Sequence, residues 1–589
     1  MMTEPDSFYQ KRVNKRVIIL TFFFFLWFFG LTLRLVELQV IEHGRLRAAA
    51  VRQNQLKSKI FPERGTIYDR RGKILARSFP TPSVSYIPSE EESLPQAMAK
   101  IQELVRVLEL SAADLKRIEA RIEKGETFIW IKRKISPEKA EQVRRLGLSE
   151  ITIQEENKRY YPLGRLAAHV LGGVNIDDEG TSGVELQYDV KLKGVTGEGL
   201  FLRDARKRHY HREVLKPPMP GQDLILTIDE TIQYIAQREL ERAVDSHGAS
   251  WGTVIISHPP SGEILALASS PGYDPNDFSA AHPEERRNRA VQYNFEPGST
   301  FKIVTAAAAR EFGLVNFTDT FDCRSGSIRV AGWTISDHKK MGVLDFSEVI
   351  IHSSNVGTTM VGQRLGPENL FRMIRAFRFG EKTGVELPGE EAGIFHPLPK
   401  WSSSSLASQS IGYGISVTAI QLLQAMNIFA NNGLLVPLHV ARETFDFSPS
   451  LQATLSPGER VISEKTASEL IEKVFEKVVL EGTGQAAQID GFTVAGKTGT
   501  AQKIDPTTGT YSARKHLASF VGFVPSRKPL LSMIVVIDEP KMGLHYGGQV
   551  AAPAFQEIVR RVLLHLGRTP QFEPARKVIT ARLRETSNR

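Results

Sequence analysis

The chain contains very little cysteine for its length. Among its 589 residues only Cys323 is a cysteine, 5 are tryptophan and 8% are aromatic. A single cysteine excludes a disulfide within the chain. No cysteine motif surrounds Cys323, so we expect a small core residue there rather than a nucleophile. We expect no metal and no other cofactor, because His209 and His211 have no evident acidic or cysteine partner.

Motifs for nucleic-acid recognition are also missing, although the chain is basic. Its formal net charge is +9 and its pI is about 9.3. No basic tract interleaved with aromatic residues accompanies this charge, so we expect no nucleic-acid partner. An anionic membrane surface or cell wall explains the charge more simply.

One long apolar run lies near the N-terminus. It extends from Val17 to Leu33 and, with Arg34 reaching to the interface, to Val36. About 20 residues of this kind span a hydrocarbon core of roughly 30 Å. A cleaved signal peptide is the rival interpretation, but the small residues Ala48 to Ala50 lie too far beyond the run.

Basic residues before this run predict its orientation: Lys11, Arg12, Lys15 and Arg16. Positive charge stays on the cytoplasmic side of a membrane helix. We therefore expect a single-pass protein of the inner (cytoplasmic) membrane. Its N-terminus would lie in the cytoplasm, and its bulk in the periplasm or outside.

The length of the chain allows more than one folded core, and we expect at least two domains. The predicted segments are a cytoplasmic tail (1–16), a transmembrane anchor (17–36), a helical stalk (37–60), an α+β pedestal domain (61–214), a second and larger domain (215–567) and a disordered tail (568–589). A linker rich in proline, Leu215 to Gly221, separates the two large domains.

The second domain has strand patterns at both ends and helices between them. Residues 253–257 and 263–269 predict an antiparallel hairpin after a helix over 230–244. Three further strands are predicted at 492–503, 518–524 and 531–537, followed by a closing helix over 553–566. These patterns predict an α+β fold, in which helices cover an antiparallel sheet and its first and last elements are adjacent.

Ser299 and Lys302 form an S-x-x-K pair just after the turn signal Pro297-Gly298. The apolar residues that follow predict a buried helix ending near Gly313. Ser299 would lie in its first turn, where free N–H groups favour negative charge, and Lys302 on the same face. A desolvated lysine can be neutral enough to deprotonate a serine. The alternative is a helix-capping serine beside a surface lysine.

Two companion motifs follow in order along the chain. Ser353 and Asn355 form S-x-N, in which the serine could relay a proton and the asparagine could hold a substrate amide. The run Lys497-Thr-Gly-Thr500 is expected on a strand, where Gly499 would let a peptide approach the backbone closely. Each motif alone is weak, but the ordered set is typical of serine enzymes that attack penicillin or D-alanyl-D-alanine peptides.

On these motifs the chain resembles the class B penicillin-binding proteins, membrane-anchored peptidoglycan D,D-transpeptidases, and most closely the cell-division subgroup. The resemblance extends from Arg64 to about Leu566. Further motifs that carry it are Arg64 to Gly72, Arg159 to Pro162 with Ala168-His169, Gly183 to Glu185, Ser270 to Pro275 and Gly412 to Gly414. It implies a transpeptidase domain over 215–567, a pedestal that binds partners, and β-lactams as inhibitors.

The resemblance also implies roles for individual residues. The catalytic set would be the nucleophile Ser299, its base Lys302, Ser353, Asn355 and Lys497. Substrate-binding residues would be Thr498, Gly499, Thr500 and Tyr413. Lys497 and Thr498 would meet the terminal carboxylate of the donor peptide, and the N–H groups of Ser299 and Thr500 would form the oxyanion hole.

Other interpretations of single residues stay open at this point. Tyr413 could line the cleft or pack in the core. His352, beside Ser353, suggests a catalytic triad, but triads are recognised by geometry. Gly482-Thr-Gly484 lacks the Gly-Lys-Ser/Thr ending of a phosphate loop and is typical of a turn.

The predicted function is cross-linking of peptidoglycan stem peptides through a Ser299 acyl-enzyme, during septal wall synthesis. The alternatives within the class are a D,D-carboxypeptidase, a β-lactamase or a penicillin sensor. An alternative from another class is a mainly non-catalytic scaffold for a glycan polymerase. Expected partners are stem peptides, the membrane, a polytopic membrane glycosyltransferase and other division proteins.

Overall fold

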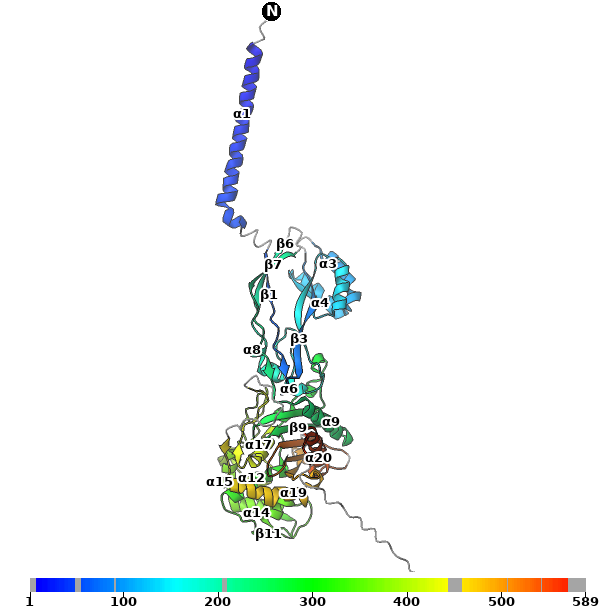
Figure 1. Ribbon diagram of the computed structural model, residues 1–589, viewed down its shortest axis with the longest axis vertical. Coiled ribbons are helices and arrows are strands. Elements are labelled where there is room, and N and C mark those ends of the chain that lie inside the picture. Colours follow the sequence, from blue (N-terminus) through cyan, green and yellow to red (C-terminus); the bar gives the residue numbers. More distant parts are fainter. Residues whose placement is uncertain are drawn as a thin grey trace, which may run out of the picture. The chain divides into compact units, whose positions relative to one another are not determined.

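The chain forms two compact units whose segments alternate along the sequence (Figure 1). The computed structural model describes residues 7–47, 55–88, 92–203, 209–442, 458–505, 507–541 and 543–569. The first unit comprises residues 1–63, 80–156 and 194–220, and the second comprises 64–79, 157–193 and 221–589. The predicted boundary at residue 214 stays a prediction, because the units interleave there. Most of the predicted disordered tail lies outside the described residues.

A long helix, α1 (Ser7–Val36), contains the predicted anchor and continues into a π-helical turn, η1 (Glu37–Ile41). Together they give a segment of 30 residues, Arg12–Ile41, that is long and apolar enough to cross a membrane. The prediction of a helical stalk over 37–60 is wrong at its C-terminal end. Residues Gln55–Ile60 form strand β1, because they pair antiparallel with β6 (Gly197–Arg203), far away in the sequence.

The first unit combines a three-stranded sheet with a small helical subdomain. The sheet has the order β1-β6-β7, with β7 at His209–Lys216. The helical part is α3 (Leu94–Leu108), α4 (Ala112–Glu123) and α5 (Pro137–Arg145), with strand β4 (Ile129–Lys132). Ser111 and Ser136 accept hydrogen bonds at the starts of α4 and α5, as their positions predict. The strands β3 (Ile74–Tyr86) and β5 (Ile151–Tyr160) contribute residues to both units.

The second unit is built on a five-stranded antiparallel sheet with the order β10-β9-β19-β18-β17. Its strands are β9 (Trp251–His258), β10 (Glu263–Ser270), β17 (Ala495–Ile504), β18 (Tyr511–Val524) and β19 (Leu531–Asp538). β9 pairs with β19, so the first and last parts of the domain are adjacent, as the sequence predicts. β17 lies at the edge of the sheet.

Alternating residues bury both faces of this sheet. Val254 and Val535 pack in one core with α9 (Glu230–Ser246) and α20 (Gly547–His565). Ile255 and Ile534 face the other core, which holds the buried helices α12 (Lys302–Glu311) and α17 (Ala419–Ala430). The sheet therefore lies between two helical layers (Figure 1).

Further helices of this unit are α10 (Pro283–Arg286), α11 (Arg289–Gln292), α13 (Phe346–Ile351), α14 (Asn355–Leu365), α15 (Pro367–Ala376), α16 (Ser405–Ser410), α18 (Glu464–Leu470) and α19 (Glu476–Leu480). A smaller part of the unit contains β2 (Ile67–Tyr68), β8 (Leu224–Ile225), α6 (Ala168–Leu171), α7 (Gly183–Gln187) and α8 (Asp189–Leu192).

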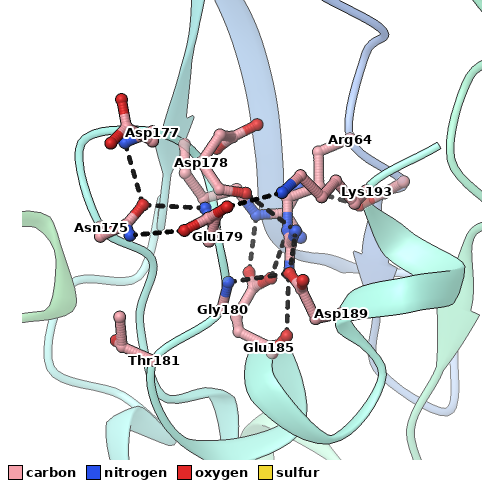
Figure 2. Close-up of polar contacts among 12 residues, drawn as sticks. Arg64, Asn175, Asp177, Asp178, Glu179, Gly180, Thr181, Glu185, Asp189 and Lys193 are labelled. Atoms are coloured by element: carbon pink, nitrogen blue, oxygen red, sulfur yellow. Dashed lines mark hydrogen bonds and ion pairs between the residues drawn. The ribbon is translucent and has the colours of Figure 1, made fainter. Parts of the chain in front are cut away.

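Three of the motifs in the predicted pedestal meet at Glu185, on α7. Arg64 Nε donates to Glu185 Oε2 at 2.7 Å, and Arg159 Nε donates to Glu185 Oε1 at 2.6 Å. Arg64 also donates to Asp189 Oδ1 at 2.7 Å (Figure 2). The side chains of both arginines and of Glu185 are buried. These motifs therefore form a buried ion cluster within the second unit.

Candidate active site

Ser299 lies in a short 3-10 turn, η3 (Gly298–Phe301), directly before α12. Gly298 N donates to Gly412 O at 3.0 Å, which ties this turn to the Gly412–Gly414 segment. Ser299 is half-buried and lines a cleft of about 730 Å³. The predicted helix is present and ends at Glu311, but its first turn is tighter than an α-helix. Ser299 thus combines exposure to the cleft with a position at the start of a helix.

The S-x-N motif joins α13 to α14. Ser353 has a φ of 58°, a left-handed conformation that is uncommon for a residue with a side chain. Ser354, not Ser353, caps α14, because its hydroxyl accepts from Gly357 N at 2.9 Å. The strained conformation of Ser353 turns its side chain away from the helix cap and leaves it on the cleft wall.

Asp337 fixes this junction from another part of the chain. Its carboxylate accepts from Ser354 Oγ at 2.8 Å and from Val356 N at 3.1 Å, and it also accepts from Asn355 N. A carboxylate at the N-terminus of a helix is favourable for the helix dipole. Asp337 could not be predicted from the sequence, because nothing in the S-x-N motif indicates a hydrogen-bond partner 17 positions earlier.

Lys302 is fully buried beneath these residues. Its Nζ donates to Ser353 O at 2.7 Å and to Asn355 Oδ1 at 2.8 Å, and lies 3.3 Å from Ser353 Oγ. Burial, together with the nearby charge of Lys497, holds the pKa of Lys302 well below its usual value. Within the described residues these bonds join Lys302 to Ser353 and Asn355, and none joins it to Ser299.

Lys497 approaches the same hydroxyl from the sheet. Its Nζ donates to Ser353 Oγ at 3.0 Å and to Thr498 O at 3.1 Å. Burial lowers the pKa of Lys497 to about 7. Two buried amines that share one hydroxyl cannot both be charged without mutual repulsion. The site can therefore hold one amine neutral and the other charged near neutral pH.

Strand β17 carries the remaining predicted residues. The side chains of Thr498 and Thr500 line the cleft, and Thr500 Oγ1 accepts from Gly547 N, at the start of α20, at 3.0 Å. Gly499 has a packing role, and its predicted role in the approach of a peptide stays a prediction. A Cβ at this position would lie 2.4 Å from Ser519 Oγ and 2.7 Å from Thr300 Cγ2. The glycine is therefore required for packing β17 against the nucleophile turn.

The cleft brings together the three motifs of the sequence in one site. Ser299, Ser353, Asn355, Thr498 and Thr500 all line it. Lys302 and Lys497 lie buried behind them and reach the cleft through Ser353.

Comparison with known proteins identifies this arrangement. Residues 252–560 match the family model of the penicillin-binding protein transpeptidase domain, and residues 59–226 match that of the penicillin-binding protein dimerisation domain. The chain belongs to the penicillin-binding proteins.

The penicillin-binding protein is similar to relatives from several bacteria. It is 35% identical over 547 residues to the probable peptidoglycan D,D-transpeptidase PenA of Neisseria meningitidis, covering 92% of this chain and 91% of that protein. It is 36% identical to the stage V sporulation protein D of Bacillus subtilis, covering 95% and 87%. A crystal structure of penicillin-binding protein 3 from Mycobacterium tuberculosis, complexed with aztreonam, matches with a TM-score of 0.66, 28% identity and coverage of 88% and 99%.

Tyr413 of this penicillin-binding protein lines the cleft, so the choice left open for it is resolved. Its hydroxyl accepts from Gln502 N at 3.4 Å, and its ring packs edge-on against Tyr511 at 5.3 Å. Tyr511 in turn donates to Glu296 Oε1 at 3.1 Å, and Glu296 accepts from Gly414 N at 2.7 Å. The contacts link the nucleophile turn to the edge strand β17 and to its neighbour β18.

The cleft also contains residues that the sequence analysis did not select: Asp337, His338, Thr483, His516, His545 and Tyr546. Thr483 belongs to the predicted turn at 482–484, and its hydroxyl is 2.6 Å from Thr498 Oγ1. The rings of His516 and His545 are stacked at 4.4 Å. No local signal identifies these residues, because strand pairing and the loop before α20 bring them to the cleft.

Proposed function

We propose that this protein is a peptidoglycan D,D-transpeptidase that cross-links stem peptides through an acyl-enzyme on Ser299. The observation that carries the proposal is the pair of buried amines, Lys302 and Lys497, that meet at the Ser353 hydroxyl behind the Ser299 cleft. This arrangement supplies a neutral base, a positive charge and a proton relay within one site.

In the first step Ser299 Oγ attacks the carbonyl carbon between the last two D-alanines of a stem peptide. Lys302, neutral because of its lowered pKa, accepts the hydroxyl proton. The carbonyl oxygen becomes an oxyanion, stabilised by the backbone N–H groups of Ser299 and Thr500. Each such donor is typically worth roughly 2.7–4 kcal/mol in the transition state.

In the second step the bond to the leaving amine breaks. Ser353 lies between the two lysine amines, so it can pass a proton from Lys302 to the nitrogen of the departing D-alanine. An ester between Ser299 and the remaining peptide is left. The amine of a neighbouring stem peptide then attacks this ester, its proton returns through the same groups, and Ser299 is regenerated.

Binding of the donor peptide is assigned to the sheet side of the cleft. Lys497, when charged, with Thr498 and Thr500 would hold the terminal carboxylate. Asn355 uses Oδ1 to accept from Lys302 and one hydrogen of Nδ2 to bond Ser336 O at 2.9 Å. Its second Nδ2 hydrogen is available for a substrate carbonyl, because an amide nitrogen carries two donors.

The test is product analysis with a peptide ending in D-alanyl-D-alanine as donor and an amine acceptor. Both activities release free D-alanine: a transpeptidase also yields the cross-linked amide, whereas a carboxypeptidase also yields the shortened peptide acid. Ser299→Ala should abolish the amide and the release of D-alanine. Ser403→Ala, an exposed serine of the same unit, is the matched control and should leave both unchanged. Shortened peptide and D-alanine from the wild type, without the cross-linked amide, would contradict transpeptidation.

We assign the protein to the inner (cytoplasmic) membrane, with its N-terminus in the cytoplasm and the chain beyond the membrane segment outside. The basic residues Lys11, Arg12, Lys15 and Arg16, which precede the apolar run from Val17, support this orientation. Septal wall synthesis with a polytopic glycosyltransferase is the proposed process. The similarity to a sporulation protein keeps spore formation as a second process. Complementation of a division-defective strain by the wild type but not by Ser299→Ala would support an essential catalytic role in division; rescue by both would support a scaffold.

A further inference from the structure

A small lobe extends the wall of the cleft beyond the catalytic residues. Strand β11 (Thr320–Asp322) pairs with β14 (Val343–Asp345) and closes the base of the lobe. Inside it, β12 (Ser327–Val330) and β13 (Trp333–Ser336) form a hairpin. Its two turn residues, 331 and 332, have φ values of 48° and 85°, as the tight turn of a two-residue hairpin requires.

The base of this hairpin belongs to the cleft. Ser336, Asp337 and His338, which end β13 and follow it, all line the cleft. Ser336 O accepts from Asn355 Nδ2, and Asp337 caps α14. The hairpin is therefore fixed to the S-x-N motif. Its tip lies only a few residues along the strand from the cleft wall, so a ligand that extends out of the cleft along this wall reaches the tip.

The tip carries an exposed indole. Trp333 is 71% exposed, although its face of the hairpin is otherwise apolar and shared with Ile328, Val330 and Ile335. Ile328 packs against the core of the unit, whereas Trp333 extends beyond it. A large exposed aromatic side chain is a usual element of a binding surface, because its faces are apolar and its N–H is polar.

The lobe also carries positive charge. Arg329, Lys339 and Lys340 are exposed, and within the described residues no carboxylate forms an ion pair with them. Arg329 pairs with Thr334 and lies on the opposite face of the hairpin from Trp333, whereas Lys339 and Lys340 follow the residues that line the cleft. In contrast, Arg324 of the same lobe is paired with Asp322 at 2.6 Å. The lobe therefore presents one indole and three uncompensated cations next to the cleft.

We propose that this lobe, through Trp333 at the hairpin tip and the cations Arg329, Lys339 and Lys340, binds the glycan-linked acceptor strand of peptidoglycan. The proposal rests on the proposed function. The apolar faces of sugar rings would pack on the indole, and the carboxylates of the stem peptides would meet the cations. The acceptor amine would then enter the cleft past Ser336 and His338. Charge complementarity and continuity with the cleft are the two arguments for this occupant.

The test compares two acceptors with the full-length protein in detergent. One is a free stem-peptide amine without sugar, and the other is uncross-linked glycan strands that carry stem peptides. Trp333→Ala should lower cross-linking to the glycan strands by roughly three- to tenfold, as expected for one aromatic contact, and leave the free amine unaffected. Tyr234→Ala removes an aromatic residue that is 51% exposed on α9, and it should change neither reaction.

A second pair of variants tests the charges. Lys339→Gln with Lys340→Gln should weaken binding of the glycan strands at low salt, and the difference from the wild type should shrink at about 1 M salt, where screening acts over roughly 3 Å. Lys382→Gln with Lys528→Gln removes two other exposed lysines of the same unit and should have no effect.

Binding is also measured without chemistry, from the change in tryptophan fluorescence when glycan strands are added. The wild type should respond and Trp333→Ala should not. Two results with Trp333→Ala would overturn the proposal: equal losses of cross-linking with both acceptors, or unchanged binding of and cross-linking to the glycan strands. The proposal would also be overturned if variants of the hairpin lost only the ability to bind another protein. If the wild type binds strands but forms no acyl-enzyme, the proposed function fails and this inference stands.

Discussion

At the Ser353 hydroxyl, two lysine amines from distant parts of the chain meet in a buried site. Within the described residues no carboxylate forms an ion pair with Lys302 or Lys497, and both amines bond to Ser353. Desolvation disfavours the protonated form of a lysine, and at Lys302 it outweighs the opposing effect of the Asp337 carboxylate. The unusual acid–base behaviour of this site therefore follows from burial, and the motifs provide the groups that are buried.

We predict a bell-shaped pH dependence for acylation by penicillin. The rate rises as Lys302 loses its proton, because only the neutral amine is a base. It falls again as Lys497, whose pKa is about 7, loses the charge that attracts the carboxylate of the ligand. The two apparent values belong to the coupled pair. If Lys497 had the pKa of an ordinary lysine, the rate would instead fall at about pH 10.4.

The measurement is kcat/KM for acylation across the pH range, with Lys497→Arg as the control. Arginine stays charged, so the pH at which the acylation rate of this variant falls should be several units higher. A wild-type profile that is flat up to about pH 10, where an ordinary lysine titrates, would contradict the assignment of Lys497.

Replacing the base gives a second prediction. Lys302→Met keeps the approximate length of the side chain and removes the amine, and acylation should slow by about 10²- to 10⁴-fold, the usual contribution of a general base. The melting temperature should be measured alongside, to show that the buried methionine is accommodated. A folded variant whose acylation is less than about tenfold slower would exclude Lys302 as the base.

At the scale of elements, the start of α14 determines the position of Ser353 and Asn355. Asp337 holds this helix end through two backbone N–H groups and the Ser354 hydroxyl. Asp337→Ala should lower the free energy of unfolding by about 0.5–2 kcal/mol, as for other helix caps. It should also slow acylation, because Ser353 and Asn355 lose their support.

The matched control is Ser111→Ala, which removes the N-cap of α4 in the first unit, where Ser111 Oγ accepts from Asp114 N at 3.1 Å. A similar loss of stability with unchanged acylation is expected there. If both variants slow acylation to the same degree, the effect of Asp337 is general destabilisation.

Local patterns predicted most elements of the second unit and the identity of the motif residues. The closing helix begins at Gly547, six positions before the predicted start at 553. Gly547 packs closely against β17 and β18: an added Cβ would lie 2.3 Å from Gly499 O and from Ser519 O. Strand β1 was predicted as helix, because its pairing partner β6 lies more than a hundred residues later. Asp337 and Thr483 were not selected for the same reason: only tertiary contacts bring them to the cleft.

At the scale of the molecule, the two compact units interleave, and the buried cluster around Glu185 ties together two of the three segments of the second unit. Removing the charge of Glu185 should lower the free energy of unfolding. Glu185→Gln leaves Arg64 and Arg159 less compensated in a buried site, and breaking such a pair usually costs about 3–5 kcal/mol. The loss of penicillin labelling with increasing denaturant measures this change.

The control for Glu185 is Glu141→Gln on α5, whose partners Arg144 and Arg145 are 58% and 76% exposed. A pair exposed to this degree contributes about 0–1 kcal/mol. Equal sensitivity of the two variants to denaturant would show that the Glu185 cluster does not stabilise the second unit.

The central claim is that Ser299 forms the acyl-enzyme, and intact-mass spectrometry of the full-length protein after penicillin treatment tests it most directly. The account predicts one adduct per molecule, equal to the mass of the penicillin, on the wild type and on Ser403→Ala, and none on Ser299→Ala. A folded wild type without an adduct, or an adduct that persists on Ser299→Ala, would contradict it.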